Sequence, residues 1–90
     1  MKNKKYRCPC CGYFTLGDEP GHFYICPVCF WEDDNIQSFD PNYTGGANGI
    51  SLTEARINYK RIGAMDKGSL KYVRPPTEEE KIDQESKITD

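Results

Sequence analysis

The pattern of apolar and polar positions divides this chain into short β-like runs, one helical segment and a polar end. Residues 13–16 and 23–25 are rich in aromatic and β-branched side chains, and the residues between them include two glycines and a proline. This arrangement predicts a β-hairpin. Residues 69–74 alternate with a period of two, which predicts a third strand.

A helix is predicted over about residues 51–63. Ser51 and Glu54 have the spacing of a capping box, in which the two side chains accept hydrogen bonds from free backbone N–H groups of the first turn. The apolar side chains behind them fall on one helical stripe: Leu52, Ala55, Tyr59 and Ile62. Gly63 is a suitable C-terminal stop. We expect the stripe to pack on the hairpin.

Composition limits the class of protein. The chain has 90 residues, 37% of them hydrophobic, and a mean hydropathy of -0.78. It lacks the run of roughly 18 uncharged residues that a membrane-spanning helix needs. Its basic start has no apolar stretch behind it, so a secretory signal is not expected. We therefore expect a cytoplasmic protein, in which five cysteines indicate a metal site rather than disulfides.

Charge is segregated along the chain. Residues 12–46 contain six acidic side chains and no Lys or Arg, whereas residues 47–74 contain six basic side chains and two acidic ones. Residues 75–90 are acidic and have no aromatic side chain. We predict a single domain over residues 1–74 and a disordered acidic tail over residues 75–90.

The cysteines form two Cys-Pro-x-Cys turns, at Cys8–Cys11 and Cys26–Cys29, separated by fourteen residues. Cysteines three apart on a tight turn can direct both sulfurs at one point, and proline fixes φ at the start of the turn. Two such turns supply the four thiolates of a closed structural zinc site. Iron in a rubredoxin-like site uses the same ligands, and this alternative stays open.

Cys10 is the fifth cysteine. It is either a small residue in the middle of the first turn or a reactive accessory thiol beside the metal. His22 is the only histidine, and we expect it on the surface of a turn rather than as a reserve ligand.

The stretch from residue 30 to residue 50 is long for a connection inside so small a domain. Its acidic cluster, Glu32–Asp34, could bind a hard cation or supply general acid and base groups, but adjacent acids on a loop are more often simply solvated. The Gly-rich segment at residues 45–49 precedes a helix, as anion sites do. It lacks the Gly-Lys-Ser/Thr of a P-loop, so we interpret it as loop geometry and a cap.

Several of these motifs together resemble a known family. They are CPCCG at residues 8–12, ICPVCFWEDD at 25–34, GGAN at 45–48 and the SLxEAR helix start at 51–56. Over about residues 7–76 the chain resembles the bacterial cysteine-rich CPCC family. The resemblance implies small cytoplasmic proteins with no established biochemical activity, and it is consistent with the domain and metal predictions.

We therefore predict a small α+β domain: a zinc-ribbon or rubredoxin-like β-hairpin with two CPxC turns, a third strand and one packed helix. A closed four-thiolate site has no open position for catalysis, so we expect a zinc-stabilised binding or adaptor domain for another protein rather than an enzyme. The expected interaction surface contains Trp31, Asp33, Asp34, Arg56 and Lys60.

Two alternatives belong to other functional classes. A nucleic-acid-binding zinc ribbon would use basic side chains from two segments: Lys2, Lys4, Lys5 and Arg7 with Arg56, Lys60 and Arg61. The acidic middle of the chain argues against it, because phosphate contacts supply most non-specific affinity. A thiol-redox or hydrolytic enzyme would use Cys10 or the acidic loop.

Overall fold

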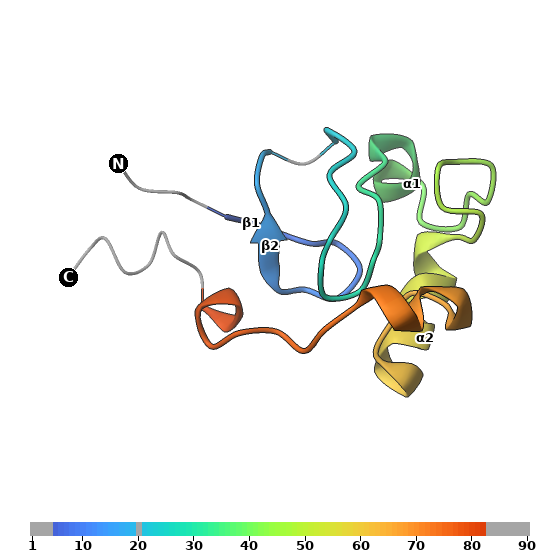
Figure 1. The fold of residues 1–90 in the computed structure, drawn as a ribbon. Helices are drawn as coiled ribbons and strands as arrows, with labels where there is room; N and C mark the ends of the chain where they lie inside the picture. Colours follow the sequence, from blue (N-terminus) through green and yellow to red (C-terminus); the bar gives the residue numbers. More distant parts are fainter. Residues whose placement is uncertain (1–4, 20, 83–90) are drawn as a thin grey trace.

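The computed structural model describes residues 5–19 and 21–82 (Figure 1). The elements in chain order are two strands, β1 (Tyr6–Arg7) and β2 (Phe14–Leu16), two helices, α1 (Asn35–Phe39) and α2 (Leu52–Ile62), and two 3-10 helices, η1 (Lys67–Tyr72) and η2 (Glu79–Lys81). In Figure 1 the strands lie on one side of the molecule and α1 and α2 on the other, with the two cysteine-containing loops between them.

Strand pairing differs from the predicted hairpin. Strand β2 pairs antiparallel with β1, with Tyr6 opposite Leu16. The segment at residues 23–25 forms an isolated bridge instead, between Ile25 and Glu32. The prediction that residues 13–16 pair with residues 23–25 was therefore wrong. Each cysteine turn brings its own flanking residues together, and closing these short loops costs less entropy than pairing the two segments with each other.

The predicted third strand was also wrong, because residues 67–72 form the 3-10 helix η1. Asp66 caps this helix: its Oδ1 atom accepts hydrogen bonds from the Ser69 backbone N–H at 3.0 Å and from the Ser69 hydroxyl at 2.7 Å. Ser69 is buried, whereas Leu70 and Tyr72 are 45% and 58% exposed. The alternating apolar positions thus face solvent, the reverse of what a strand packed on a core requires.

Helix α2 confirms the prediction for residues 51–63. Ser51 Oγ accepts a hydrogen bond from the Glu54 N–H at 3.1 Å, and Gly63 ends the helix with a left-handed φ of 86°. Leu52 and Ala55 are fully buried, and the stripe becomes more exposed toward Ile62. The first half of the helix therefore supplies the packing against the rest of the domain.

The stretch from residue 30 to residue 50 contains a helix that the sequence pattern did not indicate, α1. Asp34 is its N-cap: one carboxylate oxygen accepts from the Ile36 N–H at 2.8 Å, and the other accepts from the Ala47 N–H at 3.0 Å. A Cβ atom at Gly46 would lie 2.6 Å from Asp34 Oδ2, so only glycine lets this backbone come so close.

Gln37 and Asn48 hold the rest of this stretch in place. Gln37 is fully buried and donates to the carbonyls of Tyr43 and Ile50, and its Oε1 accepts from the Asn48 side chain at 2.8 Å. Asn48 also pairs with both backbone groups of Glu32, at 2.7 and 2.8 Å. Buried amides with satisfied donors and acceptors thus fold a segment that has little apolar material.

The core is small and surrounds the cysteines. Its largest fully buried apolar side chains, Trp31, Leu16, Leu52 and Val28, lie in one cluster with Cys8, Cys26 and Cys29. A chain of this size usually needs a metal or disulfides to supplement such a core.

The first part of the predicted tail is folded. Residues 75–82 include η2, which contacts β2, and Glu80 forms a two-pronged ion pair with Arg74 at 2.8 and 2.9 Å. The expected disorder therefore does not apply to residues 75–82. Residues 83–90 lie outside the described residues.

Candidate metal centre

The two cysteine turns have the same backbone hydrogen bonds. In the first turn the Gly12 N–H donates to the Cys8 carbonyl at 2.9 Å, and in the second the Phe30 N–H donates to the Cys26 carbonyl at 2.8 Å. The flanking bonds also match, from Cys8 N–H to the Tyr13 carbonyl and from Cys26 N–H to the Trp31 carbonyl. We refer to residues 8–12 and 26–30 as the first and second knuckles.

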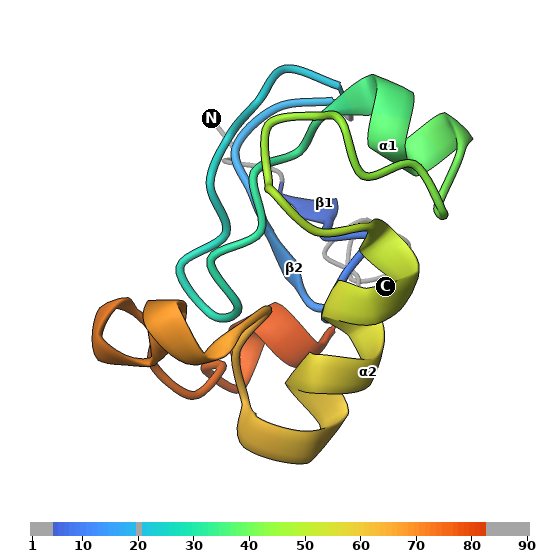
Figure 2. The ribbon, with the colours of Figure 1, turned by 90° about the vertical axis from the view of Figure 1, so that its right-hand side faces the viewer.

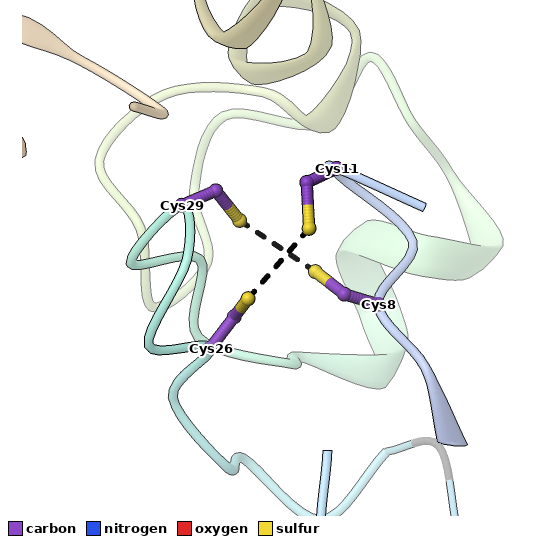
Figure 3. Close-up of side chains that lie close together, drawn as sticks. All are labelled: Cys8, Cys11, Cys26 and Cys29. Carbon is purple, nitrogen blue, oxygen red and sulfur yellow. Dashed lines mark hydrogen bonds between the residues drawn. The ribbon is translucent and has the colours of Figure 1, made fainter. Parts of the chain in front are cut away.

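The four cysteine side chains of the knuckles converge on one point (Figure 3). All four sulfurs lie within 4.8 Å of one another. The Cys8–Cys29 distance is 3.6 Å and the Cys11–Cys26 distance is 3.7 Å, and these two pairs cross in the figure. A tetrahedral ion with metal–sulfur bonds of about 2.3 Å needs sulfurs about 3.8 Å apart. The spacing therefore fits a single four-coordinate metal ion.

The environment of the sulfurs also suits a cation. Cys8, Cys26 and Cys29 are fully buried, and Cys11 is half-buried. Cys26 Sγ is 3.0 Å from the Thr15 hydroxyl and accepts from the Val28 N–H at 3.3 Å. Donors of this kind stabilise a thiolate relative to a thiol.

Without a cation, the cluster cannot carry four negative charges. The pKa of Cys26 is held far below its usual range, chiefly because the Cys11 thiol donates to its sulfur. The pKa values of the other three cysteines are raised, chiefly because each thiol hydrogen-bonds to a neighbouring sulfur: Cys11 for Cys8, Cys26 for Cys11 and Cys10 for Cys29. A bound cation would stabilise the thiolate form of all four ligands and displace their protons.

The sequence profile of the family described as cysteine-rich CPCC matches residues 6–80, including both knuckles, α2 and η1. The chain belongs to the cysteine-rich CPCC family. A search of curated proteins finds no match for this CPCC protein. In the described residues, no helix is long and apolar enough to cross a membrane.

The remaining cysteine of the CPCC motif, Cys10, is not one of the clustered ligands among the described residues. Its side chain is 8% exposed and belongs to the core around the knuckles. This position matches the simpler of the two sequence interpretations, a small residue in the middle of the turn. Its reactivity as a thiol stays a prediction. His22 is exposed, as expected.

Three residues of the predicted interaction surface are buried. Trp31 is 0% exposed, Asp33 is 1% exposed and Asp34 is 5% exposed. Trp31 fills the core beside the cysteines, and one Asp33 carboxylate oxygen accepts from the Gly21 N–H at 2.9 Å. This burial excludes all three from an exposed surface. Trp31 packs in the core, and the two acids satisfy backbone donors instead of facing solvent.

The basic residues named for a surface are placed differently. Lys60 is exposed. Arg56 is exposed too, but its Nε donates to the Pro9 carbonyl at 2.8 Å and so ties α2 to the first knuckle. The Arg7 guanidinium lies 4.9 Å from the centre of the Phe14 ring. Residues 1–4, with Lys2 and Lys4, lie outside the described residues.

Sequence reasoning missed the residues that support the knuckles from outside them. Thr15 contacts Cys26 Sγ, and Asn48 binds the backbone of Glu32 just after the second knuckle. Neither residue carries a spacing signal. A polar side chain inside a run that favours a β-strand, as Thr15 is, was the one available indication.

Proposed function

We propose that the four clustered cysteines hold one structural Zn²⁺ ion and that this CPCC domain is a binding module for another protein. The observation that carries the first part is the closure of the site. Four sulfurs, three of them fully buried, converge at the spacing of a tetrahedral ion. An ion with four protein ligands has no open position for substrate or water, so its contribution is to stabilise the fold.

A stabilising metal ion is favoured because the described part of the chain has few other sources of stability. The apolar core is small. All five cysteines lie within the described residues, and none of them forms a disulfide there. In such a domain the free energy of metal binding contributes directly to folding. Zn²⁺ adds this stability without redox chemistry.

Metal analysis of the purified full chain tests this part. We expect one zinc per chain by elemental analysis and a colourless protein. Since overexpressed iron sites can load zinc, the purified protein is also stripped and reconstituted with equal amounts of Zn²⁺ and Fe²⁺. Preferential recovery of iron, with the visible absorption of a ferric thiolate site in air, would overturn the zinc assignment.

Support for the binding role comes from the fate of the acidic loop and from the exposed surface. Asp33 and Asp34 satisfy backbone N–H groups and are not available as acid or base groups facing a substrate. Large apolar side chains remain exposed at the end of α2 and on η1, including Ile62, Leu70 and Tyr72. Contiguous exposed apolar side chains are typical of protein interaction sites.

Cross-linking and affinity capture from the source cells with the metal-loaded chain test the binding role. We expect a reproducible partner that is lost when Cys26→Ser disrupts the fold. Recovery of the same proteins by the wild type and by the unfolded variant would contradict a specific module.

A further inference from the structure

A shallow apolar groove lies between the end of α2, η1 and the segment that follows η1. Its volume is about 330 Å³. The lining is almost entirely apolar: Tyr59, Ile62, Gly63, Leu70, Val73, Arg74, Pro75 and Pro76. In Figure 2 the orange η1 segment lies beside the yellow C-terminal part of α2. Ile62 and Leu70 remain 41% and 45% exposed there.

The walls of this groove are fixed to the second knuckle. The Met65 N–H donates to the Cys29 carbonyl at 2.9 Å, and the Arg74 N–H donates to the Pro27 carbonyl at 3.3 Å. The side chain of Asn58 donates to the Met65 carbonyl at 2.9 Å and holds the turn after α2. The groove is therefore formed before any ligand arrives, which lowers the entropic cost of binding.

The segments that form the groove and follow it carry a net positive charge. Residues 59–81 contain six basic side chains and four acidic ones: Lys60, Arg61, Lys67, Lys71, Arg74 and Lys81 against Asp66, Glu78, Glu79 and Glu80. Glu78 is paired with Lys81. The Asp66 carboxylate is occupied in capping η1, and Arg74 is paired with Glu80. Within residues 5–19 and 21–82, neither Lys60, Arg61 nor Lys67 forms an ion pair. The chain as a whole has a net charge of -2, so this positive segment contrasts with the average.

We propose that this groove binds an acidic peptide segment of a partner protein, with one apolar side chain in the groove and flanking carboxylates on the basic side chains. This inference rests on the proposed binding role and adds the surface and the chemistry of the partner. A groove of this volume accommodates one aliphatic or aromatic side chain. The surrounding cations select carboxylates and speed the encounter.

Nucleic acid is the other polyanion that a basic face attracts. Phosphate contacts would leave the apolar lining and the exposed Ile62 and Leu70 side chains unused. A peptide uses both the charge and the apolar surface, so the structure favours it.

The test uses the full metal-loaded chain and a labelled peptide, Glu-Asp-Glu-Leu-Phe-Asp-Glu-Asp, followed by fluorescence anisotropy. Leu70→Gln and Ile62→Gln alter the groove at exposed positions, so the fold should be retained. Ile57→Gln is the matched control, because Ile57 lies on the same helix, is 51% exposed and does not line the groove. We expect the two groove variants to weaken binding about tenfold and the control to change it less than about twofold.

Two further peptides separate charge from apolar contact. Replacing the acids by Gln, or the Leu-Phe pair by Ser-Ser, should each reduce binding about tenfold or more, and binding of the parent peptide should weaken as salt rises. Amide chemical shifts should change at Ile62, Leu70 and Val73. The proposal is overturned if the peptide does not bind, if Ile57→Gln weakens binding as much as Leu70→Gln, or if the uncharged peptide binds equally well.

Other occupants of the groove give distinct results. Displacement of the peptide by a single-stranded oligonucleotide at lower concentration would overturn the proposal in favour of nucleic acid. Self-association in sedimentation experiments that Leu70→Gln abolishes would overturn it in favour of a second copy. If a captured cellular partner still binds Leu70→Gln as tightly as the wild type, the groove assignment fails while the proposed binding role stands.

Discussion

The two knuckles have the same backbone but are secured in different ways. The first ends at Gly12, with φ of 84°, and the second ends at Phe30, with φ of 73°. Glycine adopts this left-handed conformation at little cost, whereas a bulky side chain is strained there by about 1–2 kcal/mol. In the second knuckle the Phe30 ring stacks on Tyr72, with ring centres 5.0 Å apart.

Contacts outside the knuckles extend this difference. The backbone of the second knuckle accepts hydrogen bonds from Met65 and Arg74, and fully buried Val28 and Trp31 lie in and beside it. The first knuckle is held by the short β1–β2 pair and by the Arg56 side chain on Pro9. The C-terminal half of the domain is thus attached to the second knuckle. The first knuckle is held to the rest of the domain less firmly.

The largest effect is expected from removing the ligands. Cys26→Ser should abolish metal binding and cooperative unfolding, because Cys26 is fully buried and accepts from Thr15 and Val28. Cys11→Ser should keep the metal with an affinity lowered by roughly 100-fold, since this position is half-buried and water can replace the sulfur. Competition with a chelator and circular dichroism measure both. Equal losses in the two variants would contradict the unequal roles of the knuckles.

Asn48→Ala should be the next most damaging change. It leaves the Glu32 N–H without its acceptor and removes the side-chain donor to the Glu32 carbonyl and to buried Gln37 Oε1, which should lower the free energy of unfolding by about 2–4 kcal/mol. Urea denaturation of the metal-loaded protein measures this. Asn42→Ala, at an exposed position, is the matched control and should cost less than about 1 kcal/mol. Comparable losses at both positions would show that burial of the amide does not matter.

The strain at Phe30 can be separated from its stacking by a double-mutant cycle. Phe30→Gly relieves the strain and removes the stack, so its effect on the wild type should be small, within about 1 kcal/mol. In a Tyr72→Ala background the stack is already lost, and Phe30→Gly should then be neutral or stabilising. Gly12→Ala should destabilise by about 1 kcal/mol, because φ is positive and little else lies near the new Cβ. Additive effects at Phe30 and Tyr72 would rule out the compensation.

The smallest effect concerns the ion pair beside the second knuckle. Arg74 lowers the pKa of Glu80, so the pair adds stability above the usual pKa of a glutamate, and this stability is lost as pH falls through the lowered value. Glu80→Gln should cost less than about 1 kcal/mol near pH 7, since Arg74 is partly exposed, and nothing in acid. Thermal melts of both proteins across pH give the difference. A cost that grows in acid would contradict this sign.

The sequence was sufficient for features whose causes are local. The two Cys-Pro-x-Cys turns predicted the four residues that cluster, and Ser51, Glu54 and Gly63 predicted the extent of α2. The sequence was insufficient where one segment could pair with either of two neighbouring segments. Residues 13–16 favour a strand with either neighbour, and the two residues of β1 give no pattern that could identify them as the partner. Helix α1 depends on Asp34 and Gln37, whose burial follows from the folded loop and not from their neighbours in sequence.

The matched hydrogen bonds within the knuckles have a consequence for how the ion enters and leaves. Each knuckle is a bidentate ligand whose shape is set by its own short loop. An ion bound by one pair of sulfurs therefore meets the other pair at high effective concentration. Half-liganded species should be short-lived. We therefore expect exchange of the ion to require one whole knuckle to move away from the other. The first knuckle, which is held less firmly, is the one expected to move.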